Sequence, residues 1–384
     1  MTLKSLLRRA YRLVFALTVA LYGLFLGRPA RIAPANPNRV LVLRFGLLGD
    51  GILLTPALRL LRQAWPEARI DVLATPVQVP VFELPALVDR VHVWAAGDLW
   101  ELRDAIRPQR WVSAWRTVAA LRRERYDAIL SCYGPLGSAL ALVAGAPRRI
   151  GYASEALPGT LTDPLPGARW DGPGHDAEYN VEIVRALGTA SPAPDSLVQV
   201  TNKARSAVAK LLPLAQGVLC VLHPGAANGQ AKRWPVEYWK VLARRLAADG
   251  HAVIVVGSGK EDAARAASIV DDARHNLVDR TTLPELFAVI ERASVFVSGD
   301  SGPMHAAVAL GRPAVAIHGP TDPAINGPYH AGNALVVRHT LPCSPCYRLD
   351  RPANCPLGHT LCQRLIHPDA VYEAVNTLLR RQGT

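Results

Sequence analysis

The stretch ASVFVSGDSGPMHAAVALGRPAVAIHG, residues 293–319, decides the fold class that we predict for this chain of 384 residues. Its two apolar runs, 293–298 and 313–319, have the length of buried strands, and small residues at helical spacing lie between them. A strand, a helix and a second strand in this order predict one parallel β–α–β unit. The first strand runs directly into an acidic residue, a hydroxyl and a glycine, so the mouth of the helix is a candidate binding site.

The same alternation of strands and helices runs along most of the chain. Helical segments separate the apolar runs predicted as strands, which are residues 40–45, 70–74, 91–94, 127–132, 217–223, 251–257, 275–279, 293–298 and 313–319. A polar, proline-rich stretch at 188–202 interrupts the pattern and is the predicted domain boundary. We therefore predict an α/β protein with two doubly wound parallel domains, 37–195 and 203–366, and a C-terminal helix at 367–384.

The N-terminal segment, residues 1–36, is basic at its start and apolar in its middle. An uncharged run at 13–27 follows the basic residues Lys4, Arg8, Arg9 and Arg12. Fifteen helical residues extend about 22 Å, less than the roughly 30 Å hydrocarbon core of a bilayer. A helix lying on an anionic membrane, a cleaved signal peptide and a buried helix all fit this pattern, and we predict the first of the three.

Positive charge is the other clear feature of the composition. The net charge of +12 at pH 7 attracts phosphates, nucleic acid or anionic lipid head groups. Because aromatic residues make up only 6% of the chain and no basic stripe is interleaved with them, we predict no nucleic-acid partner. Arginines crowd residues 100–125 and recur at 148 and 149, as a solvated helix face or as a cradle for acidic sugars and phosphates of a lipid-linked glycan.

The end of the first predicted strand carries a candidate general base. In RFGLLGDGILLTPAL, residues 44–58, Asp50 lies between two glycines at the start of a helix. Its carboxylate either caps the helix or faces the ligand as a base, and the position alone leaves both roles open.

The strand ends of the second half carry groups suited to an anionic ligand. HPGAANGQAKRWP, residues 223–235, places Lys232 in a glycine-rich turn, as an anion site or as a solvated basic loop. Glu261 follows the next strand, where it accepts from a ribose hydroxyl or caps a helix. Ser301 and Gly302 offer backbone N–H groups at a helix start, where the dipole favours phosphate. Together these groups predict a nucleotide-diphosphate site, and no Asp-x-Asp pair is placed to hold a metal between the phosphates.

Four cysteines near the C-terminus are spaced C-x2-C-x8-C-x6-C. They are Cys343, Cys346, Cys355 and Cys362. A structural zinc site and a set of reduced structural thiols both fit this spacing, and four thiolates leave no open position for catalysis by the metal.

Four segments together resemble glycosyltransferase family 9, which contains the ADP-heptose:lipopolysaccharide heptosyltransferases. They are LRFGLLGDGILLTPALRLLRQAWPEARIDVLA (43–74), HPGAANGQAKRWPVEYWKVLARRL (223–246), VSGDSGPMHAAVALGRPAVAIHGPTDP (297–323) and CSPCYRLDRPANCPLGHTLC (343–362). The resemblance implies a GT-B fold, with two Rossmann-like domains facing a central cleft. It also implies an inverting transfer from a nucleotide sugar that requires no metal.

The resemblance also implies roles for individual residues. Asp50 is similar to the family's catalytic carboxylate, and Lys232 to the lysine that meets the donor phosphates. The expected donor-binding residues are Lys232, Asp300, Ser301, Gly302, Met304, His305, Glu261 and Thr281. Where the family usually has a serine or threonine before the Gly-Asp pair, this chain has Gly46, which removes a hydroxyl from the acceptor side. The acceptor candidates are Gly46, Arg116, Arg148 and Arg149.

The function predicted from these residues is transfer of a sugar, heptose from ADP-heptose, onto a lipopolysaccharide core or a related surface glycan. The predicted location is the cytoplasmic face of the bacterial inner membrane. Two alternatives remain open at this point: a non-catalytic protein that binds a nucleotide sugar or glycan at the membrane, and a nucleotide-sugar epimerase on the same scaffold.

Overall fold

The computed structural model describes residues 3–26, 34, 36–167, 174–212, 217–227, 229–347 and 354–382. Parts of the N-terminal segment, of the cysteine cluster and of the predicted C-terminal helix lie outside these ranges, at residues 1–2, 27–33 and 35, at 348–353, and at 383–384. The chain forms two compact units, Met1–Pro194 and Asp195–Thr384, here called unit 1 and unit 2.

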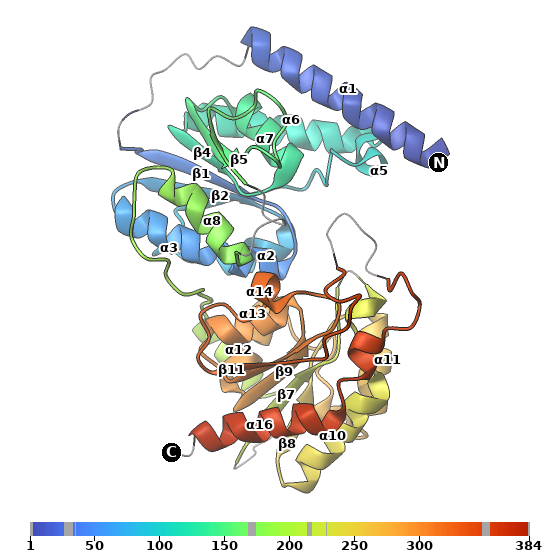
Figure 1. Cartoon of the computed structure of the whole chain (residues 1–384). Helices are drawn as coiled ribbons and strands as arrows, with labels where there is room; N and C mark the ends of the chain where they lie inside the picture. Colours follow the sequence, from blue (N-terminus) through green and yellow to red (C-terminus); the bar gives the residue numbers. More distant parts are fainter. Residues whose placement is uncertain are drawn as a thin grey trace. The chain divides into compact units, whose positions relative to one another are not determined.

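Unit 1 is built on a parallel sheet with helices on both faces (Figure 1). Its described strands lie in the order β3-β2-β1-β4-β5-β6. Their bounds are β1 Arg39–Arg44, β2 Arg69–Ala74, β3 Arg90–Val93, β4 Ala128–Ser131, β5 Arg148–Tyr152 and β6 Asp163–Leu165. Helices α3 (Thr55–Ala64) and α8 (Asp176–Arg185) pack together, as do α6 (Pro108–Glu124) and α7 (Gly134–Ala144). The apolar strands fit this position because both faces of a parallel sheet are covered.

The segment after β1 is not one continuous helix, although residues 51–65 are apolar at helical spacing. It forms a short helix, α2 (Leu48–Ile52), and then α3, with a break at Leu53 and Leu54. Thr55 donates its hydroxyl hydrogen to the carbonyl of Ile52, and Pro56 occupies the first turn of α3, a position where its missing N–H is tolerated. Asp50 therefore lies in the short helix α2, separate from the longer helix α3.

Unit 2 repeats the architecture with its own parallel sheet (Figure 1). Its described strands lie in the order β11-β10-β9-β7-β8. Their bounds are β7 Leu219–His223, β8 Ala252–Val255, β9 Val295–Gly299, β10 Ala314–His318 and β11 Ala334–Arg338. Around them lie α9 Asn202–Val208, α10 Val236–Ala248, α11 Lys260–Ile269, α12 Leu283–Arg292, α13 Gly302–Ala309 and α16 Pro368–Gln382.

The strand predicted over 275–279 is not present. The chain there makes a single parallel bridge, from Asn276 to Val255 at the end of β8, after the short turn η3 (Ala273–His275). Val278 is held instead by a local bond from its N–H to the side chain of Asn276. The sheet edge next to β8 is therefore covered by a loop that carries polar residues.

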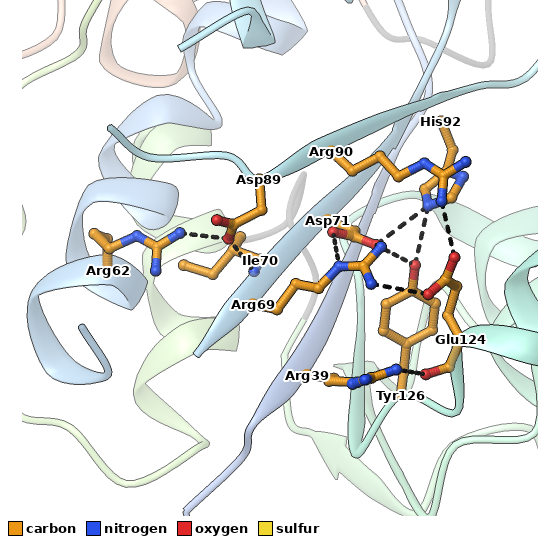
Figure 2. A network of polar contacts seen from close by, with 10 residues as sticks. All are labelled: Arg39, Arg62, Arg69, Ile70, Asp71, Asp89, Arg90, His92, Glu124 and Tyr126. Atoms are coloured by element: carbon orange, nitrogen blue, oxygen red, sulfur yellow. Dashed lines mark hydrogen bonds and ion pairs between the residues drawn. The ribbon is translucent and has the colours of Figure 1, made fainter. Parts of the chain in front are cut away.

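A polar network ties together the amino ends of the strands in unit 1 (Figure 2). The buried carboxylate of Asp71 in β2 accepts hydrogen bonds from Arg69 and from the hydroxyl of Tyr126, and lies 3.3 Å from the ring of His92. Glu124, the last residue of α6, accepts from Arg69 and Arg90. This network lies at the opposite end of the sheet from Asp50, so it anchors the strands that position the site.

Residues Leu3–Leu26 of the N-terminal segment form helix α1, which packs on the rest of unit 1. Val19 is buried against Leu142 of α7, and Tyr11 donates to the backbone carbonyl of Leu99. Within the described ranges, we find no helix long and apolar enough to cross a bilayer.

Candidate active site

Each unit has one point at which its strand order reverses. In unit 1 this point lies between β1 and β4, and in unit 2 between β7 and β9. In open α/β sheets, ligands bind outside the carboxyl ends of the strands at such points. Asp50 follows β1 and Asp300 follows β9, so each candidate acid lies at the switch point of its own unit.

In unit 1, Asp50 is the third residue of α2 and its carboxylate is held on both oxygens. Oδ1 accepts a hydrogen bond from Arg44 at 2.8 Å, and Oδ2 accepts the backbone N–H of Leu47 at 2.7 Å. The side chain still keeps 34% of its surface exposed. The carboxylate is therefore oriented and also reachable by a ligand, as a general base must be.

Arg44 connects Asp50 to a second carboxylate. The same guanidinium nitrogen that binds Asp50 lies 2.8 Å from Oδ2 of Asp176, in the first turn of α8, and another nitrogen donates to the carbonyl of Cys132. Arg44 and Asp176 are both buried. Because a buried charge needs its partner, Asp176 fixes Arg44, and Arg44 in turn fixes Asp50.

Gly46 allows the carboxylate of Asp50 to lie against the backbone. Its φ of +152° is a conformation that favours glycine, and a Cβ added there would lie 2.4 Å from Oδ2 of Asp50. Thr75 donates its hydroxyl hydrogen to the carbonyl of Gly46 at 2.9 Å. A serine or threonine at position 46 is therefore incompatible with this placement of Asp50.

In unit 2, Lys232 and Asp300 form a nearly buried ion pair. The Lys232 ammonium donates to Oδ2 of Asp300 at 2.7 Å, and lies 4.1 Å from the ring centroid of Tyr347. Burial on its own would raise the pKa of Asp300, but the charges of Lys232 and His318 outweigh it and hold that pKa below its usual range. Asp300 is therefore ionised, and it fixes the ammonium at the end of β9.

A hydrogen-bonded chain connects the ends of β7 and β9. The ring of His223 lies 3.0 Å from the hydroxyl of Ser298, which lies 2.7 Å from the hydroxyl of Ser301 before α13. Burial lowers the pKa of His223 to about 4, although Asp262 acts in the opposite direction, so the ring is neutral at pH 7. This chain fixes the residue that precedes the N-terminus of α13, where backbone N–H groups can receive an anion.

The model of glycosyltransferase family 9, described as heptosyltransferase, matches residues 114–355, which is more than half of the chain. The chain belongs to glycosyltransferase family 9. The prediction of this family from the sequence is thus confirmed.

Relatives of known name come from several bacteria. The chain is 27% identical over 366 residues to lipopolysaccharide heptosyltransferase 2 of Escherichia coli K12, covering 90% of this chain and 99% of that protein. It is 32% identical over 165 residues to lipooligosaccharide heptosyltransferase 2 of Campylobacter jejuni, which is 41% of this chain. That match spans only 50% of the Campylobacter protein, about half its length.

Two solved structures confirm the predicted GT-B fold of this family 9 protein. ADP-heptose lipopolysaccharide heptosyltransferase II of E. coli superposes with a TM-score of 0.71 at 24% identity, covering 90% of this chain and 100% of that one. A family 9 glycosyltransferase of Veillonella parvula superposes with a TM-score of 0.76 at 22% identity. The match covers 90% of this chain and 98% of that one.

Some predicted donor residues of this family 9 protein lie away from Lys232 and Asp300, or have other partners. Glu261 forms an ion pair with Arg233, and Thr281 precedes α12, in the loop beyond β8. Met304 is completely buried in the first turn of α13, and His305 beside it is nearly so. Asp300, Ser301, Gly302 and Lys232 do lie together, at the ends of β7 and β9.

The arginines predicted to hold an acceptor are not brought to Asp50. Arg148 and Arg149 begin β5, so they lie at the amino edge of the sheet, whereas Asp50 follows the carboxyl end of parallel β1. Arg149 is buried and donates to the carbonyls of Thr160 and Ala146, and Arg148 pairs with Asp163. Arg116 is exposed midway along α6. Of the four acceptor candidates, only Gly46 touches Asp50.

The four clustered cysteines are free thiols, and Cys362 is buried. In the described part of the chain, no three His, Cys, Asp or Glu side chains are arranged to hold a metal ion. The segment nonetheless borders the Lys232 site, because Gln363 donates to the backbone carbonyl of Lys232 and Cys346 donates its N–H to Pro320.

Sequence reasoning missed Arg44, Asp176 and Tyr347. A signal existed for Arg44, because it is the one charged residue in the apolar run 40–45. No local pattern marks Asp176, which lies 132 residues from its partner, or Tyr347, whose ring faces Lys232 from outside the sheet.

Proposed function

We propose that this family 9 protein is an inverting glycosyltransferase that requires no metal and moves heptose from ADP-heptose onto a lipopolysaccharide core or a related surface glycan. The observation that carries the proposal is the oriented, partly exposed carboxylate of Asp50 at the switch point of unit 1. The names of the E. coli relatives support the donor and the acceptor class.

In this mechanism Asp50 is the general base. It accepts the proton of an acceptor hydroxyl while the hydroxyl oxygen attacks the anomeric carbon of the donor. The nucleotide diphosphate leaves from the opposite face, which inverts the configuration. Because a diphosphate has a low pKa, its departure needs no second carboxylate as general acid, unlike hydrolysis by a glycosidase.

The leaving diphosphate is received by unit 2 in this proposal. Lys232 supplies a positive charge that Asp300 and Tyr347 already hold in place. The N–H groups of Ser301 and Gly302 at the start of α13 add hydrogen-bond donors aligned with the helix dipole. Such fixed charges stabilise the developing phosphate charge without reorganising during the reaction.

The decisive test replaces Asp50 by asparagine. Asp50→Asn keeps the size of the side chain but removes the base, so we expect heptosyl transfer to fall by about 10²- to 10⁴-fold. ADP binding, measured by calorimetry, should stay unchanged.

Asp89→Asn is the matched control, because Asp89 is also a partly exposed carboxylate that accepts from an arginine and a backbone N–H, at the amino end of the sheet (Figure 2). We expect this control to transfer heptose at the wild-type rate. Full activity of Asp50→Asn would contradict the proposal. Binding of ADP-heptose with no transfer by the wild type would favour a binding protein, and interconversion of the donor without an acceptor would favour an epimerase.

We further propose that Cys343, Cys346, Cys355 and Cys362, which within the described ranges are not already arranged around a metal ion, rearrange to bind one structural zinc ion. Burial, followed by the charges of the other three thiols, raises the pKa of Cys362 to about 11, which is the mutual repulsion that a bound cation would relieve. Burial opposes ionisation of Cys355, but backbone N–H groups led by that of Thr360 outweigh it and lower its pKa. Metal analysis of the purified chain, with Cys355→Ser as comparison, tests this site.

We also propose that the protein works at the cytoplasmic face of the bacterial inner membrane. The surplus of positive charge and the uncharged middle of α1 support this location.

A further inference from the structure

Helix α1 packs against the rest of unit 1 through one of its faces. Tyr11, Phe15 and Val19 recur every four residues and point toward the body of unit 1. The ring of Phe15 lies edge-on to Trp100 at 5.8 Å, and Val19 is buried. The inner face of α1 is therefore docked like any other amphipathic helix.

The outer face of α1 is apolar as well, and nothing in unit 1 covers it. Leu13, Val14, Leu17 and Leu21 keep between 55% and 61% of their surface exposed. At 100° per residue they lie on the side of the helix opposite Val19. Single exposed leucines are ordinary, but a continuous exposed stripe indicates a surface that meets lipid or another molecule.

Helix α6 continues this stripe. It lies beside α1: the ring centroids of Trp111 and Phe15 are 6.4 Å apart, and Arg122 of α6 donates to the hydroxyl of Tyr22. Figure 1 shows the two helices on the same side of the sheet. Val112 of α6 is 51% exposed, and Trp115, one turn after Trp111, is 71% exposed. Two helices distant in the sequence thus contribute apolar side chains to one surface.

The charges on these two helices are nearly all positive. Helix α1 has no acidic residue, and α6 has only Glu124, which is engaged by Arg69 and Arg90 (Figure 2). Arg8, Arg9, Arg116 and Arg123 are exposed on the two helices. An apolar stripe with tryptophan, bordered by arginines, matches the interface of an anionic bilayer, where lipid head groups meet acyl chains.

We propose that α1 and α6 together form a membrane-docking surface for an anionic lipid bilayer, with Leu13, Val14, Leu17, Leu21, Val112 and Trp115 entering the interface. Both helices lie on the bilayer, and neither crosses it. The inference deepens the proposed membrane location by assigning its surface, and it gives α6 and Arg116 a role in binding lipid in place of acceptor recognition. Sugar transfer by Asp50 does not depend on it, so the two proposals can fail separately.

The test measures binding of the full chain to vesicles. We expect co-sedimentation with phosphatidylcholine vesicles that contain phosphatidylglycerol, and weaker binding to pure phosphatidylcholine or at high salt. Val112→Glu should lower the partition coefficient by about tenfold or more, because it places a negative charge in the contact. Val241→Glu is the matched control: Val241 lies on α10 of unit 2 and is 43% exposed, so this variant should bind as the wild type does.

Three results would overturn the inference. The first is a wild type that ignores anionic vesicles, and the second is Val112→Glu binding as tightly as Val241→Glu. The third is a dimer, seen by analytical ultracentrifugation, that Val112→Glu dissociates while vesicle binding is absent, which would assign the surface to a second copy of the chain. Val112 is half exposed, so the variant should fold, and intact heptosyl transfer to a soluble acceptor, which requires Asp50 of the same unit, checks that unit 1 has folded. Loss of vesicle binding with intact transfer to a soluble acceptor would leave the proposed reaction standing.

Discussion

At Gly46, one missing side chain sets the position of the proposed base. A Cβ at this residue would lie 2.4 Å from Oδ2 of Asp50, so Gly46→Ala must displace the carboxylate from Arg44 and from the N–H of Leu47. We expect the transfer rate to fall by about 10²-fold, the typical effect of misplacing a reacting group by 1 Å, while ADP binding stays unchanged. Steady-state kinetics with saturating donor measure this.

Gly188→Ala separates the clash from backbone strain. Gly188 also has a positive φ, +117°, but an added Cβ there meets no atom within 4 Å. We expect this control to lose some stability and to keep its transfer rate per folded molecule. Equal loss of rate in both variants would show that strain, and not the contact with Asp50, matters at position 46.

The site shows how far single residues can be predicted from the sequence. Asp50, Lys232 and Asp300 follow apolar runs, and a parallel sheet collects whatever follows its strands, so their positions were predictable. The pairing of Arg44 with Asp176 was not, because it depends on the docking of α8 against the sheet. The same limit explains why Arg148 and Arg149 were predicted as acceptor-binding residues. Their charge suggested a ligand, but the fold places them at the start of β5, where Arg148 pairs with Asp163 and Arg149 donates to the carbonyl of Thr160.

At the level of elements, the network around Asp71 should set the acid stability of unit 1. Burial alone would raise the pKa of Asp71, but hydrogen bonds from His92, Tyr126 and Arg69 outweigh it and hold the pKa below its usual range. Because the pKa of Asp71 is lower in the folded state than in the unfolded state, its ionised form stabilises the fold. This contribution is complete at pH values above the unfolded pKa, near 4, and is lost as the pH falls through the folded pKa.

Asp71→Asn removes this contribution. We expect the free energy of unfolding to fall by about 2–4 kcal/mol at pH 7, because Arg69 and Tyr126 lose a buried charged acceptor. The difference in unfolding free energy between wild type and variant should become smaller below pH 4, since only the wild type has a titrating group at this position. Urea unfolding at pH 7 and pH 3, with the transition of unit 1 followed separately from that of unit 2, measures both values. Asp369→Asn is the control: Asp369 forms an exposed ion pair with Arg245, so its replacement should change the unfolding free energy little. A difference between Asp71→Asn and the wild type that does not depend on pH would contradict the argument.

Most of the apolar strands were predictable from the sequence, but β11 was missed although four of its five residues are apolar. β1, β7, β9 and β10 lie within predicted runs or one residue beyond them. β5 was missed because it starts with two arginines and contains Gly151, and β6 because it has three residues, one of them Pro164. The run at 275–279 was predicted as a strand from its apolar residues, but only Asn276 bridges to the sheet.

On the scale of the whole molecule, the proposed roles are divided between the units, and this division can be measured. Lys232 and Asp300 belong to unit 2, whereas Asp50 belongs to unit 1. Lys232→Met should therefore weaken ADP binding by about tenfold or more, since a charged hydrogen bond to phosphate contributes roughly 1.5–3 kcal/mol. Asp50→Asn should bind ADP as the wild type does. Lys203→Met, at an exposed lysine of α9, controls for the loss of one positive charge.

Isothermal titration calorimetry is the suitable measurement, because two compact units need not unfold together and a melting temperature would mix them. Weaker binding by Lys203→Met would mean that net charge alone attracts the nucleotide. Weaker binding by Asp50→Asn would mean that the acid of unit 1 contacts the donor. If Lys232→Met alone loses affinity, then the ammonium that Asp300 and Tyr347 hold in place is the group that meets the diphosphate.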